Sequence, residues 1–159
     1  MGSCERVVTR ICDEWGRQME ILETGRAKLI QRYGITDFIS IGPEEGYEFK
    51  VDSVQFSAAW TSEVYDVNGE TVEDQMWDCD AKTYRPRTLT PAEDRAVQFA
   101  TELTGLLEGC YIAVRHCVKE FGWSHYDDDY DGEVFHNDAY SFHIIAPYWS
   151  RNPDLVMRI

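Results

Sequence analysis

Residues 90–122 read TPAEDRAVQFATELTGLLEGCYIAVRHCVKEFG, and this stretch decides the fold. Thr90 supplies a capping hydroxyl, Pro91 occupies the first helical position, and Glu93 stands three residues after the cap, which is the pattern of a capping box. Gly122 is a natural helix end. Apolar residues recur at alternating steps of three and four, at Ala100, Leu103, Leu107, Cys110, Val114, Cys117 and Phe121. We predict a helix with this stripe in the core.

A second helix is predicted at the N-terminus, over roughly residues 3–33. Ser3 is a suitable N-cap and Gly34 a suitable stop. Its apolar residues also follow steps of three and four, at Val8, Ile11, Cys12, Trp15, Met19, Leu22, Leu29, Ile30 and Tyr33. This spacing places them on one face of an amphipathic helix.

Between the helices the period changes to two, which predicts strands. Apolar and polar residues alternate over 47–58, with a slip at Asp52-Ser53 that indicates a bulge or a tight turn. Asn68-Gly69 predicts a type I′ hairpin turn. After residue 122, alternation over 140–148 predicts a further strand.

The chain is therefore expected to form a single α+β domain over residues 1–159. Two amphipathic helices would pack on one face of a mainly antiparallel sheet, in the order α-β-β-β-α-β-β. No apolar run has the length of a signal peptide or a membrane span, and the five cysteines form no C-x-x-C pair. We expect a cytoplasmic protein, in the host cytoplasm if the gene is viral, with no membrane contact.

The negative charge is concentrated in two segments. Residues 37–81 contain twelve carboxylates and a single base, Lys50, and residues 123–150 contain six carboxylates and no Lys or Arg. Such a field repels nucleic acid and attracts a basic protein, and the interleaved aromatic residues are typical interface anchors. The predicted partner-binding residues are Glu63, Tyr65, Asp66, Glu70, Glu73, Asp74, Trp77, Asp78, Asp80, Asp127, Asp128, Asp129 and Asp131.

Two functions follow from this charge pattern. The first is an acidic inhibitor that blocks the basic surface of a nucleic-acid-processing enzyme, as a nucleic-acid mimic of the anti-CRISPR or anti-restriction kind, encoded by a phage or mobile element. The second is an immunity protein that neutralises a basic nuclease toxin. Both use the same electrostatic attraction, and direct nucleic-acid binding is not expected because the strands lack a basic footprint.

Residues 127–138 carry the sharpest motif. Carboxylates stand at positions 1, 3, 5, 7 and 12 of this stretch, with glycine at position 6, and the residues are Asp127, Asp129, Asp131, Glu133, Asp138 and Gly132. The pattern resembles an EF-hand calcium loop, and the resemblance implies that these five carboxylates form a calcium site. Position 12 is Asp where the family has a bidentate Glu, and the following segment alternates like a strand. The alternative is an acidic hairpin that turns at Asp131-Gly132.

A third reading is a small acidic enzyme or a calcium-binding module centred on residues 125–143. His125, His136 and His143, with Asp138, are the candidate ligands for a transition metal. No catalytic motif is present, so no catalytic residue is assigned and the protein is expected not to be an enzyme. Apart from the calcium alternative, no cofactor is expected.

Overall fold

The computed structural model describes the backbone of residues 2–42, 45–120, 124–128, 132–136, 141–145 and 156–158. Side chains are described within residues 9–120, apart from residues 11, 12, 42–44, 118 and 119. The two helices are α1 (Gly2–Tyr33) and α2 (Pro91–Glu120). The strands are β1 (Ile35–Gly42), β2 (Gly46–Val51), β3 (Val54–Ala58), β4 (Val64–Tyr65), β5 (Gln75–Asp78), β6 (Thr83–Pro86), β7 (Ser124–Asp128), β8 (Gly132–His136), β9 (Ser141–Ile145) and β10 (Val156–Arg158).

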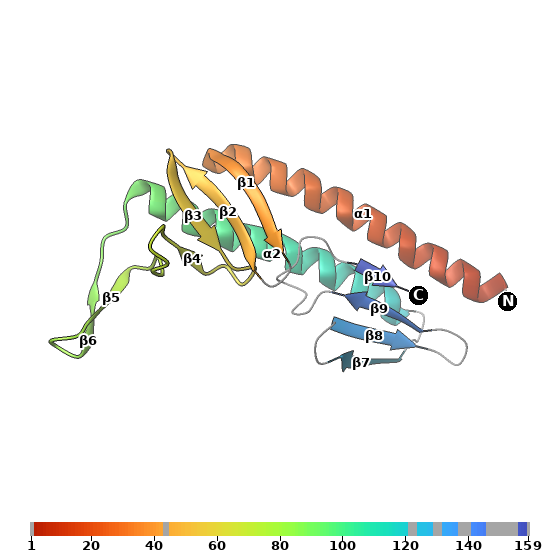
Figure 1. The fold of residues 1–159 in the computed structure, drawn as a ribbon. Helices are drawn as coiled ribbons and strands as arrows, with labels where there is room; N and C mark the ends of the chain where they lie inside the picture. The colour runs from red at the N-terminus through yellow and green to blue at the C-terminus, as the bar shows by residue number, and fades with distance from the viewer. Residues whose placement is uncertain are drawn as a thin grey trace.

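The α+β class and the order of helix, strands, helix, strands are confirmed. The described residues contain six strands between the helices and four after α2, where three and two were predicted, and they form three sheets where one was expected. The strands divide among three antiparallel sheets, which are β1-β2-β3-β4, β10-β9-β8-β7 and the two-stranded ribbon β5-β6. The long helices run side by side in opposite directions, and both lie on the same side of the first sheet (Figure 1). The last sheet lies beside the other end of the helical pair (Figure 1).

Alternation along β2 sends one set of side chains toward the helices. Tyr47, Phe49 and Val51 are fully buried, whereas Glu48 between them is exposed. Phe99 of α2 packs against this layer, with ring centroids 6.2 Å from Tyr47 and 5.2 Å from Phe49. The predicted α2 stripe is confirmed by the burial of Ala100, Leu103, Leu107, Cys110 and Val114.

The predicted capping box is present at the start of α2. The Glu93 amide donates to the Thr90 hydroxyl (3.1 Å), and the Thr90 amide donates to Glu93 Oε1 (3.0 Å). The other carboxylate oxygen of Glu93 pairs with Arg87. Hydrogen bonds from Thr90, above all the backbone one, and the Arg87 guanidinium lower the pKa of Glu93 despite its burial. The helix start is therefore fixed by short-range interactions that the sequence already shows.

Two turns were predicted with different success. Asp52 and Ser53, both at positive φ, form the two-residue turn between β2 and β3. The hairpin at Asn68-Gly69 exists, but its predicted type I′ geometry is wrong. Only Gly69 of the pair has a positive φ, of 76°, and its amide donates to the Asp66 carbonyl (3.0 Å). This is a type I turn followed by a left-handed glycine, and it forms because Asp66 Oδ1 accepts the amides of Asn68 (2.8 Å) and Glu70 (3.0 Å).

Candidate functional site

The β5-β6 ribbon projects away from the body of the molecule, at the end opposite the chain termini (Figure 1). All of its residues are exposed except the half-buried Asp78. Trp77 and Tyr84 face each other across the two strands as register partners, with ring centroids 5.1 Å apart and ring planes at 69°. Each side chain is more than half exposed, with Trp77 at 51% and Tyr84 at 59%. A ribbon this thin has no second layer to cover its aromatic residues.

A cleft of about 590 Å³ lies between this ribbon and the hairpin that follows β4. Its lining includes the aromatic pair and Met76 from the ribbon, and Glu70, Thr71 and Glu73 from the segment before the ribbon. Arg87 lies at the junction, where its backbone amide donates to the Asp74 carbonyl (2.7 Å) and its Nη1 donates to the Glu73 carbonyl (3.3 Å). These two bonds join the end of the ribbon to residues 70–74, which are called the acidic loop below.

The predicted partner-binding residues of the first acidic segment fall into two groups. Several carboxylates have structural contacts. Glu63 accepts a hydrogen bond from the Tyr65 hydroxyl (2.5 Å), which raises the pKa of Tyr65, and Asp66 holds the turn described above. Asp78 accepts the amides of Asp80 (2.9 Å) and Ala81 (3.0 Å) and pairs with Arg85.

The second group consists of exposed carboxylates outside the ion pairs of the described residues. Glu70, Glu73, Asp74 and Asp80 are exposed, and none of them forms an ion pair with a described residue. Two of them, Glu70 and Glu73, line the cleft beside Trp77. The structure therefore brings part of the predicted acidic set together with one of its predicted aromatic anchors.

The second acidic segment lies elsewhere. Asp127 and Asp128 belong to β7, where they are register partners of Glu133 and Gly132 in β8. This sheet is at the other end of the molecule from the β5-β6 ribbon (Figure 1), so β7 does not share a surface with the ribbon. Asp129, Asp131 and Asp138 lie outside the described residues, and calcium binding stays a prediction. Within the part of the chain that the structure describes, no cluster of three metal-ligating side chains occurs.

Sequence reasoning missed the second half of the ribbon. Met76, Tyr84, Arg85 and Arg87 were not among the predicted partner-binding residues. Tyr84 and Arg85 nevertheless pair with β5, and Met76, Tyr84 and Arg87 line the cleft. The available signal was the pair of aspartates at 78 and 80 before Lys82, a polar turn whose first carboxylate caps the following amides. Lys82 and Arg85 on the ribbon also reduce its negative charge relative to the prediction.

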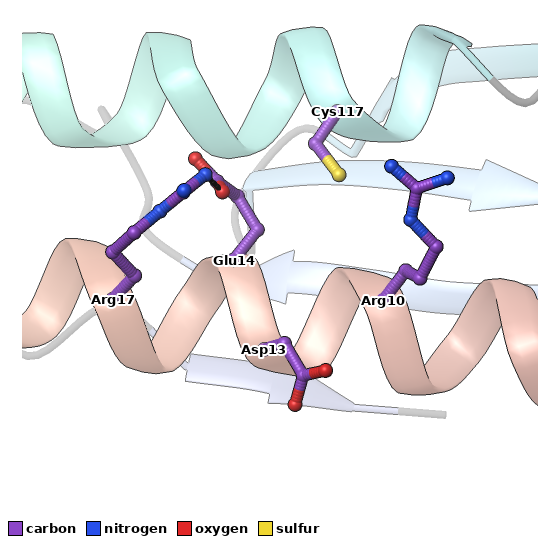
Figure 2. A pocket seen from close by; sticks show the side chains of 5 residues that line it. All are labelled: Arg10, Asp13, Glu14, Arg17 and Cys117. Carbon is purple, nitrogen blue, oxygen red and sulfur yellow. Dashed lines mark ion pairs between the residues drawn. The ribbon is translucent and has the colours of Figure 1, made fainter.

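A smaller hollow of about 300 Å³ lies between the two helices (Figure 2). Its lining includes the ion pair between Glu14 and Arg17, and the Cys117 sulfur points from α2 toward α1. Burial and the charge of Glu120 raise the pKa of the Cys117 thiol, and burial raises that of Cys110. Both thiols are therefore kept in the protonated form at neutral pH, which is the poorer nucleophile.

Comparisons of the chain with protein-family models, curated proteins and solved structures found no match. Neither described helix has an apolar stretch long enough to cross a membrane. The candidate site therefore rests on the geometry and charge of the β5-β6 ribbon and of the loop before it.

Proposed function

We propose that this protein binds a basic protein partner through residues 63–87 and, in doing so, blocks the partner's nucleic-acid-binding surface. The observation that carries the proposal is the exposed pair Trp77 and Tyr84 on a projecting ribbon, beside carboxylates that form no ion pair with a described residue. The partner is a nucleic-acid-processing enzyme, and the protein acts as its inhibitor.

The aromatic pair supports a protein interface. Trp, Tyr and Met are enriched at interface centres because they bury a large apolar area with few rotatable bonds. Trp77, Tyr84 and Met76 gain little from folding, since each stays more than half exposed in the protein alone. Their apolar surface is available to be buried by a partner.

The charges support a basic partner. Residues 63–87 contain seven carboxylates and three bases, and two of those bases, Arg85 and Arg87, pair with Asp78 and Glu93. The unpaired carboxylates therefore dominate the field around the cleft. Opposite charge accelerates encounter and suppresses wrong partners. A surface that binds phosphates is basic, so exposed carboxylates compete with nucleic acid for it.

The experiment is capture followed by competition. Immobilised protein is exposed to an extract of the cells that carry its gene, and bound proteins are released with short duplex DNA or RNA at constant ionic strength. We expect a basic nucleic-acid-processing enzyme to be released, and its activity to fall when the purified protein is added. A partner that nucleic acid does not displace would contradict the proposal, and a dedicated nuclease toxin would favour the immunity function instead.

A charge-reversal variant isolates the acidic loop. Replacing Glu70, Glu73 and Asp74 with Lys should slow association with the captured partner and flatten its salt dependence, because such charges act mainly on the encounter rate. The matched control reverses Asp13, Glu20 and Glu23 on α1, which are also exposed and change the net charge by the same amount. Equal loss in both variants would show that net charge alone governs binding. Salt independence between about 50 and 500 mM, roughly a threefold change in Debye length, would argue against electrostatic recruitment.

A further inference from the structure

The cleft combines the two groups that recognise an organic cation. Glu70 and Glu73 bring carboxylates to its lining, and Trp77 and Tyr84 bring aromatic rings to the same lining. The two rings meet edge to face, so part of each aromatic surface is left uncovered. An aromatic face attracts a cation through its quadrupole, and Trp does so most strongly.

The basic side chain that lines the cleft, Arg87, pairs with a carboxylate outside the cleft lining. Arg87 pairs with Glu93, whose lowered pKa keeps it ionised at neutral pH, and Arg87 also donates to the Glu73 carbonyl. Glu70 and Glu73 form no ion pair with a described residue. The cleft thus keeps two uncompensated negative charges beside its aromatic rings.

We propose that this cleft receives an arginine side chain of the partner. The inference rests on the proposed function and names the chemistry that this site recognises. A guanidinium is planar, so it can stack on the Trp77 ring while its N–H groups donate to the carboxylates of the lining. Lysine offers a compact and more strongly hydrated charge that uses the aromatic rings less well. Arginine is also the residue with which nucleic-acid-binding proteins most often contact phosphates and guanine, so its capture blocks such a surface directly.

The test uses the whole protein and a defined probe. The probe is a short peptide with blocked ends whose only charged side chain is one central arginine. It is titrated into the protein, and NMR follows the indole N–H resonance of Trp77. That resonance is assigned by its loss in Trp77→Phe. The same peptide with citrulline at that position keeps the shape and removes the charge. We expect the arginine peptide to shift the Trp77 resonance and to bind at least tenfold more tightly than the citrulline peptide.

Variants locate the binding. Glu70→Gln with Glu73→Gln should weaken the arginine peptide at least tenfold, whereas Glu20→Gln with Glu23→Gln removes the same charge from α1 and should leave its affinity unchanged. All four positions are exposed, so we expect melting temperatures to stay level. Absence of a Trp77 shift at millimolar arginine peptide, or equal affinity for the citrulline peptide, would overturn the inference.

The outcome separates this inference from the proposed function. If the peptide fails to bind while Trp77→Ala with Tyr84→Ala abolishes partner capture, the cleft is not an arginine receptor but the interface stands. If the arginine peptide binds as described and those same variants still capture the partner, arginine recognition stands and the proposed interface is wrong.

Discussion

Two groups of aromatic residues in this protein have opposite surroundings. In the core, Tyr47, Phe49 and Phe99 are fully buried, and the Phe99 ring lies within 6.5 Å, centroid to centroid, of four other rings. On the β5-β6 ribbon, Trp77 and Tyr84 contact each other and stay more than half exposed. The same residue types therefore serve stability in one region and are available for binding in the other.

The two aromatic groups differ in exposure because a second layer of structure covers one of them and not the other. The β1-β2-β3-β4 sheet has two helices on one face, so an alternating strand buries every second side chain there. The ribbon has two short strands and no covering element (Figure 1), so alternation along it buries little. Its apolar residues lower the free energy only when something else covers them.

The largest effect should separate the two regions by stability. Phe99→Ala removes a ring from the centre of the core and should cost about 3–5 kcal/mol of unfolding free energy. Trp77→Ala removes a larger ring from the exposed ribbon and should change it by about 0.5 kcal/mol or less. Denaturant unfolding of both variants measures the contrast. A cost for Trp77→Ala close to that of Phe99→Ala would show that the ribbon packs into the fold.

A smaller effect is expected at the start of α2, where the fold and the ribbon meet. Glu93→Gln weakens the capping box and removes the ionic partner of Arg87, and it should cost about 1 kcal/mol near neutral pH. The folded-state pKa of Glu93 lies below its ordinary value of 4.5. Its ionised form therefore stabilises the fold above that value, and the contribution is lost as the pH falls through the folded-state pKa.

The measurement is the difference in melting temperature between wild type and Glu93→Gln as a function of pH. The gap should be widest near neutral pH and should close in acid, where Glu93 is protonated in both the folded and unfolded states. A gap that widens in acid would have the wrong sign for this account. Glu23→Gln on α1 is the control for the loss of one charge, because Glu23 is exposed and forms no ion pair with a described residue.

The smallest effect concerns a polar atom in the core. The Tyr47 hydroxyl is fully buried and has no hydrogen-bond partner among the described residues. Burial raises the pKa of this hydroxyl. Tyr47→Phe keeps the ring contacts and removes an atom that gained nothing on leaving water, so stability should rise by about 1 kcal/mol or stay level. A loss above about 1 kcal/mol in denaturant melts would mean that the hydroxyl is bonded in solution.

Local signals predicted the helices and strands β2 and β3 well, whereas β1 was missed. The capping box involves residues three apart, and the stripe on α2 repeats within one element, so both depend on contacts that the sequence makes visible. The turn at Asn68-Gly69 was assigned the wrong geometry because Asp66, two residues upstream of Asn68, supplies the side-chain bonds that favour a type I turn.

The candidate site was only half predictable. Its carboxylates and Trp77 appear in the charge pattern of one segment, but Tyr84 and Arg87 reach them through strand pairing and one backbone bond between Arg87 and Asp74. Neither interaction leaves a periodic trace, because an exposed two-stranded ribbon needs no alternation of apolar and polar residues. The separation of β7, with Asp127 and Asp128, from the β5-β6 ribbon is likewise a property of the tertiary fold (Figure 1).

The most direct test of the central claim is partner capture by Trp77→Ala with Tyr84→Ala, measured beside the melting temperature of the same variant. The matched control is Ile39→Ala with Ile41→Ala, which removes two exposed apolar side chains from β1 (59% and 42% exposed). We expect the ribbon variant to have the melting temperature of the wild type and to capture at least tenfold less partner. The β1 variant should capture as much partner as the wild type. Unchanged capture by the ribbon variant, or equal loss in both, would contradict the claim that residues 63–87 form the binding surface.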